Sequence, residues 1–165
     1  MVVVGITATV VMVREGRVPF FFVPGYFLVM NSFGVLGFAA LLGWAIALRR
    51  RTDWHRRLMM CAMTAIMGPA FGRLLPAPLM IPWTAWGIFA GMILFPLAGM
   101  IHDLRQRGRV HPAWVAGLAA LVGLQLAIEL IAVSPIGTAL YAAVTAGSPG
   151  AAIAPLDYPP FPPPG

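Results

Sequence analysis

Four polar residues on three of the apolar stretches are expected to lie at a similar depth, namely Asn31, Arg73, Gln125 and Glu129. An unpaired charge inside a membrane costs several kcal/mol, so we expect Arg73 and Glu129 to pair. Such a group could bind a polar headgroup, a quinone or a proton. It could equally be an interhelix ion pair that fixes how the helices pack.

A second group of polar residues flanks the apolar stretches at the opposite ends, and it comprises His55, His102, Asp103 and His111. Imidazole and carboxylate groups are common metal ligands, so a metal ion or haem could bind here. No two of the histidines form a local HxxxH motif, and the same residues could cap helices or contact lipid headgroups. The cofactor therefore stays unknown, and neither haem nor metal is favoured.

Further chemistry-bearing patterns are few. Met59, Met63 and Met67 recur every four residues, a spacing that could pass Cu(I) but that more often serves packing. There is no GxSxG, HExxH or GxGxxG motif. All basic residues are arginine, which excludes a Schiff-base lysine and a P-loop. The sequence thus gives no reason to expect an enzyme.

Composition indicates the solvent in which these residues must be held. Of the 165 residues, 60% are hydrophobic and only 10% are charged, against about 25% in soluble domains. We therefore expect an all-α integral membrane helical bundle whose main partner is the lipid bilayer. Four full transmembrane helices are predicted, with a break at Gly68–Pro69 in the second, over residues 26–48, 58–75, 83–101 and 113–133.

The segments outside these four spans are shorter. Residues 1–13 form a short N-terminal apolar helix, about 20 Å long, which is either a partial span or the remainder of a longer one. Residues 138–146 predict a short apolar helix, and 155–165 a proline-rich tail in polyproline II. We accordingly divide the chain into a transmembrane domain, 1–133, and a C-terminal segment, 134–165.

The distribution of arginine predicts the orientation. Eight arginines fall in the loops 49–57 and 102–112, and three fall on the opposite side. Basic loops stay in the cytoplasm, so both loops are predicted to be cytoplasmic and the C-terminus periplasmic, in a bacterial inner membrane. Because the arginines lie in short loops between apolar stretches, nucleic acid is not an expected partner.

Small residues recur four apart in three of the predicted spans: Gly68 and Gly72, Gly87 and Gly91, and Ala39, Gly43 and Ala47. Such residues allow helix backbones to approach closely in lipid. They could serve packing within the bundle or an interface with another chain.

Two motifs carry a resemblance to a known group of proteins. The pattern DWHRRLM…GPAFGR…HDLRQRGRVHP, within roughly residues 45–115, resembles an uncharacterised family of bacterial multi-span inner-membrane proteins. The HRRLM element is also similar to small membrane proteins of haem–copper oxidase assembly. The resemblance implies that His55, Arg73, Asp103 and His111 are family positions. It also implies a further N-terminal span, from which residues 1–13 depart.

Three functions are compatible with these patterns. Short loops and the absence of a catalytic set favour a non-enzymatic accessory or assembly subunit, in contact with other membrane-protein subunits of a larger complex. The alternative is a membrane redox or ligand-binding protein that holds haem, metal or quinone. A small transporter is the third.

Overall fold

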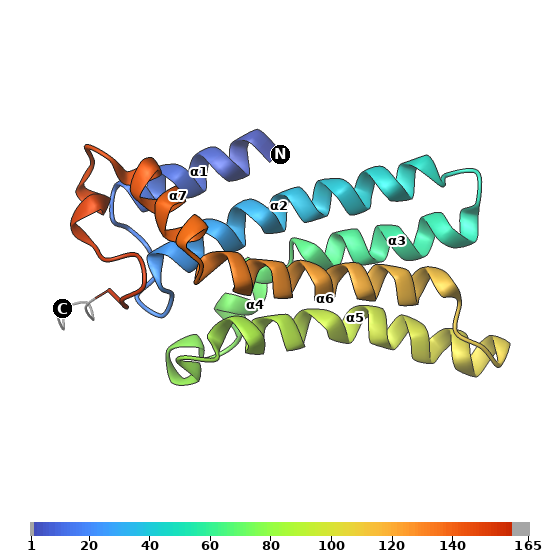
Figure 1. Cartoon of the computed structure of the whole chain (residues 1–165). Helices are drawn as coiled ribbons and strands as arrows, with labels where there is room; N and C mark the ends of the chain where they lie inside the picture. Colours follow the sequence, from blue (N-terminus) through green and yellow to red (C-terminus); the bar gives the residue numbers. More distant parts are fainter. Residues whose placement is uncertain (1, 160–165) are drawn as a thin grey trace. The chain divides into compact units, whose positions relative to one another are not determined.

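The computed structural model describes residues 2–159, and this part of the chain is helical without β-strands (Figure 1), which confirms the predicted all-α class. Its elements are α1 (Val2–Arg14), α2 (Pro24–Ala47), α3 (Thr52–Ala65), α4 (Gly68–Leu74), η1 (Ala77–Met80), α5 (Thr84–Arg107), α6 (Pro112–Ala132), α7 (Pro135–Thr145) and η2 (Pro149–Ala152).

Three of these helices are long and apolar enough to cross a membrane. Helices α2, α5 and α6 have 24, 24 and 21 residues. At 1.5 Å per residue each is more than about 30 Å long, the thickness of the hydrocarbon core. They correspond to the predicted spans 26–48, 83–101 and 113–133, although α5 continues to Arg107. These helices indicate a membrane-embedded protein.

The predicted span 58–75 is divided between two helices. Helix α3 ends at Ala65 and α4 begins at Gly68, so the predicted break is present. A proline ring clashes with the carbonyl four residues earlier, and for Pro69 that residue is Ala65. Neither α3 nor α4 reaches the length of a span. Among the described residues, three helices are long and apolar enough to cross a membrane, not the four predicted.

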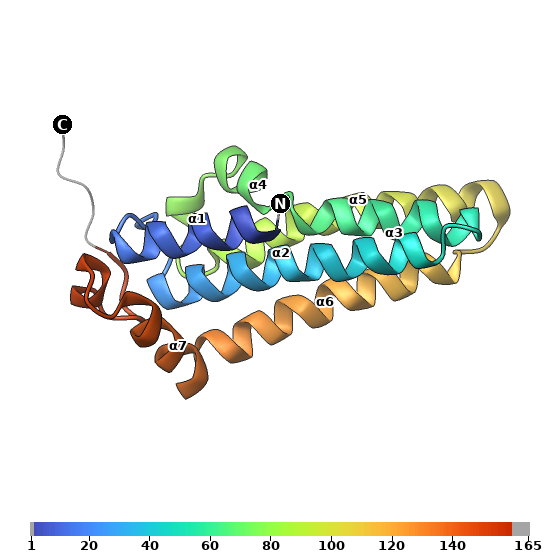
Figure 2. The same cartoon turned by 90° about the horizontal axis from the view of Figure 1, so that it is seen from above.

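The chain forms two compact units. The first comprises Met1–Phe33, Ala77–Thr84 and Leu126–Gly165, and the second Gly34–Pro76 and Ala85–Gln125. In the second unit, α3 and the adjoining parts of α2, α5 and α6 run alongside one another (Figures 1 and 2). The loops 48–51 and 108–111 lie at the same end of this unit (Figure 1).

Aromatic and small side chains form the core of the second unit. Its buried residues are Phe38, Leu41, Cys61, Ala62, Phe89, Trp114 and Leu121. Glycines allow the helices to approach: a Cβ on Gly117 would overlap the Cys61 sulfur, and one on Gly91 would overlap the Phe71 ring. The predicted close packing at Gly91 is thus present within the chain.

The first unit joins segments from both halves of the chain. The Gly25 amide at the start of α2 donates to the Pro155 carbonyl at 2.9 Å. The buried Tyr141 hydroxyl on α7 donates to the Gly150 carbonyl at 2.9 Å. Gly150 packs so closely against the Val13 carbonyl that a Cβ there would overlap its oxygen. The first residue of the proline-rich tail, Pro155, therefore contacts the start of α2, and η2 contacts the end of α1. The remainder of the predicted polyproline segment, 160–165, lies outside the described residues.

Helix α7 begins earlier than the apolar stretch 138–146 that predicted it. It starts at Pro135, and Ser134 precedes it as N-cap, its hydroxyl accepting the Gly137 amide at 3.4 Å. Serine is a favoured N-cap and proline a favoured first residue of a helix.

Candidate functional site

A buried ion pair joins α3 to α5 in the second unit. The Arg57 guanidinium donates through Nε to Asp103 Oδ2 at 2.7 Å and through Nη2 to Asp103 Oδ1 at 2.8 Å. Arg57 is 4% exposed and Asp103 5%. Bidentate pairs of this kind are the strongest and most directional of charged hydrogen bonds.

A third helix contributes to the same carboxylate. The Trp114 indole nitrogen, on α6, donates to Asp103 Oδ2 at 3.1 Å. Gly99 on α5 makes room for the indole, because a Cβ there would overlap the Trp114 ring. Asp103 is therefore the point at which α3, α5 and α6 are fixed to one another.

An exposed carboxylate, Asp53, lies beside this buried pair. Its Oδ1 accepts from Arg56 Nη2 at 3.0 Å and from Arg57 Nη1 at 3.2 Å, and Arg107 Nη1 lies 3.6 Å away. The hydrogen bond from Arg57 is the main reason that the pKa of Asp53 is lowered, against a smaller opposing effect of burial. Three guanidinium groups thus converge on one oxygen atom, and positive charge is in excess.

The three arginines and Asp103 border an open hollow of about 430 Å³. The remaining lining residues are Met60, Phe95, Ala98, Gly99, His102 and Trp114. The hollow therefore has a basic side, formed by the start of α3 and the end of α5, and an apolar side, formed by the next turn of α3 and the preceding turns of α5. Such a surface fits an amphiphilic anion better than a small ion.

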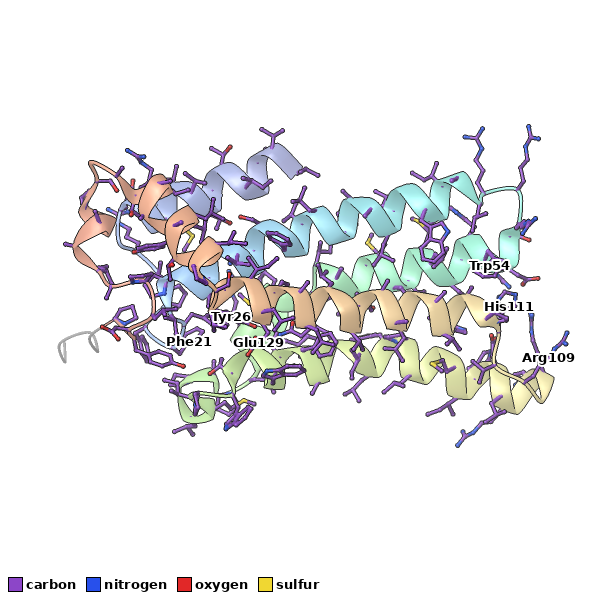
Figure 3. The ribbon with its side chains drawn as sticks, viewed as in Figure 1. Phe21, Tyr26, Trp54, Arg109, His111 and Glu129 are labelled. Atoms are coloured by element: carbon purple, nitrogen blue, oxygen red, sulfur yellow. The ribbon has the colours of Figure 1, made fainter. Side chains whose placement is uncertain are left out.

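The histidines predicted near this end have separate roles. His55 Nδ1 lies 2.8 Å from the Ala45 carbonyl. His111 precedes α6, and its Nδ1 accepts the Ala113 amide at 3.1 Å. Its ring also meets the Trp54 ring edge-on, with centroids 5.6 Å apart (Figure 3). His102 is exposed at the hollow.

The structure does not bring Asp103 and the three histidines together into one group. Both Asp103 oxygens are occupied by Arg57 and Trp114. Among residues 2–159 no group of three His, Cys, Asp or Glu side chains lies close enough to hold a metal ion. Only His102 and Asp103 of the four predicted residues border the same hollow.

The other predicted polar group is divided between the two units. Asn31 donates to the Phe27 carbonyl of its own helix at 2.9 Å, and Glu129 is half-buried on α6 of the same unit (Figure 3). Arg73 is exposed in the second unit, where Gln125 is buried. The pairing of Arg73 with Glu129 stays a prediction.

Comparison with known proteins yields no relative. No family model, no curated protein and no solved structure matches the chain.

Sequence reasoning missed Arg57 and Trp114 as site residues. Arg57 was counted only as part of a basic loop, yet it precedes the apolar Leu58 and lies four residues before Cys61. Residues three to four apart share one helix face, and Arg57, Cys61 and Thr64 are all buried on α3. This spacing was the available signal that Arg57 points inward.

Proposed function

We propose that this protein is a non-enzymatic accessory or assembly subunit of a larger complex in a bacterial inner membrane. It contacts its partner through the outward face of α2. We also propose, from the sequence pattern within residues 45–115, that the chain is related to bacterial multi-span inner-membrane proteins.

The observation that supports it is a face of α2 that nothing in the second unit covers. Leu36, Ala40, Gly43 and Ala47 lie within about 60° of one another around the helix and are all exposed. A Cβ on Gly43 would meet no atom within 4 Å. By contrast, side chains of the same unit occupy the space beside the glycines at 37, 91, 99 and 117. Small residues left open on a lipid-facing helix favour the close approach of another helix.

The chemistry of the buried polar groups points the same way. Arg57, Asp103 and Trp114 satisfy one another, and the Thr64 hydroxyl donates to the Met60 carbonyl of its own helix. These groups fix helices and leave no nucleophile beside a base. The arrangement favours a scaffold over a reaction centre.

The proposed orientation has four spans, with α3 and α4 together forming the second. The basic loops 49–57 and 102–112 are cytoplasmic and the C-terminal segment is periplasmic. Support comes from the apolar content of α2, α5 and α6 and from the common end at which the loops 48–51 and 108–111 lie.

The test is recovery of the partner from native membranes in mild detergent. The Gly43→Leu variant fills the open face and is expected to lose a partner that the unaltered chain retains in constant ratio. The control is Ala119→Leu, which adds a larger side chain at an exposed position of α6. Equal recovery with both variants would contradict the proposed interface. A Soret band or stoichiometric metal in the same preparation would favour the redox alternative.

A further inference from the structure

The hollow at the ends of α3 and α5 has a composition that the accessory role does not use. Its basic side holds more positive charge than its carboxylates neutralise, since Arg56, Arg57 and Arg107 face only Asp53 and Asp103. Arg57 is committed to the buried pair. Excess charge is therefore presented by Arg56 and Arg107.

These two guanidinium groups are available to a ligand. The side chain of Arg56 is 64% exposed and that of Arg107 is 47% exposed. Arg56 makes one hydrogen bond to Asp53, and the 3.6 Å separation of Arg107 from the same oxygen is longer than a hydrogen bond. Each guanidinium has five N–H donors in a planar fork that matches phosphate oxygens.

The apolar side of the hollow continues onto a surface that suits lipid chains. Met60 is 46% exposed and Phe95 40% exposed, and α5 is one of the helices long and apolar enough to cross a membrane. Phe95 lies about three turns before Arg107, and Ala98 and Gly99 line the hollow between them, so the apolar wall adjoins the basic side along the helix axis. A ligand that fills both sides carries an anionic group and a hydrocarbon chain.

We propose that this hollow binds one anionic phospholipid. Its phosphate lies between Arg56 and Arg107, and the start of one acyl chain lies on Met60 and Phe95. A free phosphate would use the same arginines without the apolar wall, and the experiment below separates the two sources. The inference requires a membrane environment but not the partner complex.

The experiment titrates the full-length chain, held in phosphatidylcholine nanodiscs, with phosphatidylglycerol, and counts retained lipid by native mass spectrometry. A basic residue near a membrane contributes about 1 kcal/mol to the binding of anionic lipid. The Arg56→Gln/Arg107→Gln double variant should therefore bind phosphatidylglycerol about 30-fold more weakly. Arg105→Gln is the matched control, because it removes a charge from the same exposed stretch of α5 but does not border the hollow.

Three further measurements decide the outcome. Phe95→Ala should weaken phosphatidylglycerol binding but leave any effect of inorganic phosphate unchanged. Phosphatidylcholine should not be retained. Arg107→Gln alone, which removes no hydrogen bond to the protein, should show a partial loss with the same thermal midpoint as the unaltered chain in the absence of the anionic lipid.

The proposal is overturned if Arg105→Gln weakens binding as much as the double variant, since the effect would then be one of overall charge. It is also overturned if phosphatidylcholine is retained equally, or if inorganic phosphate displaces phosphatidylglycerol completely at comparable concentration. Loss of the partner in Gly43→Leu with unchanged lipid binding would leave the two proposals independent.

Discussion

Replacing Asp103 by asparagine should destabilise the second unit strongly. The substitution keeps the shape of the side chain but removes the charge that Arg57 faces at 2.7 and 2.8 Å. The side chains of Arg57 and Asp103 are 5% and 7% exposed, so the guanidinium would lose its buried counter-ion and keep only the exposed carboxylate of Asp53. Breaking one side of a buried pair costs about 3–5 kcal/mol.

Part of the lost stability should be restored when Arg57 is replaced as well. Replacing a whole buried ion pair by apolar side chains of similar volume is often neutral or stabilising. We expect Arg57→Met/Asp103→Leu to lie within about 2 kcal/mol of the unaltered chain, although the Trp114 N–H then loses its acceptor. The assay is reversible unfolding in detergent micelles, followed by tryptophan fluorescence, for Asp103→Asn, for the single variants Arg57→Met and Asp103→Leu, and for the double variant.

The matched control is Asp53→Asn, which changes a carboxylate that also faces Arg57 but is exposed. It should cost less than about 1 kcal/mol, because exposed pairs contribute little. If Asp103→Asn is as mild as Asp53→Asn, Arg57 and Asp103 are not a buried pair. If the costs of the two single variants simply add in the double variant, the two residues do not interact.

Three more predictions follow from the structure. Burial lowers the pKa of His111, and its neutral Nδ1 accepts the Ala113 amide at the start of α6. The contribution of this contact to the free energy of unfolding should be fully present above pH 6.5 and should be lost as the pH falls through the lowered pKa. Thermal unfolding measured against pH checks this. Gly99→Ala should destabilise by about 1–3 kcal/mol in denaturant unfolding, since a Cβ overlaps the Trp114 ring, whereas Gly123→Ala meets open space and should be neutral or stabilising. Tyr141→Phe removes a buried hydrogen bond and should cost about 1 kcal/mol, with faster proteolysis after residue 148.

Each of these three has a contrary result. The direction of the His111 effect follows from proton binding. As the pH falls, the unfolded chain takes up a proton near pH 6.5, before the folded chain does, so acid favours the unfolded state. A His111→Asn variant should lose that pH dependence and keep a side-chain acceptor at the N-cap. Retention of the full pH dependence by this variant, equal costs for the two alanine variants, or unchanged proteolysis in Tyr141→Phe would each contradict the corresponding contact.

Hydropathy was sufficient to predict the long helices but not where α3 begins. The ends of α2 and α6 and the start of α5 were predicted within two residues, but α5 continues six residues beyond the predicted span. A run of about twenty apolar residues is typical of a transmembrane helix, which made these helices predictable. Pro69 predicted a break, but the sequence could not show that α3 begins within the basic loop at Thr52. The N-terminal part of α3 is charged, and its helical order depends on contacts with α5 that no local pattern specifies.

The candidate site was predicted only in part for a similar reason. Asp103 was selected as a polar residue at a span end, but it was assigned to the histidines. Its actual partner, Arg57, is 46 residues away in sequence. A carboxylate can pair with any of eight arginines predicted on its side of the membrane, and only the packing of α3 on α5 chooses among them. The four-residue spacing of Arg57 and Cys61 narrows that choice, because it places Arg57 on the same helix face as an apolar residue that is expected to be buried.

The bond between Gly25 and Pro155 has a consequence for the order in which the protein is made. The start of α2 leaves the ribosome long before residue 155, so its first amide must be satisfied by water or lipid headgroups in the meantime. Gly150 likewise reaches Val13 only after α6 and α7 have been synthesised. The connection between α1 and α2 is therefore completed late, and a fusion or an insertion near residue 150 should disturb the opposite end of the chain.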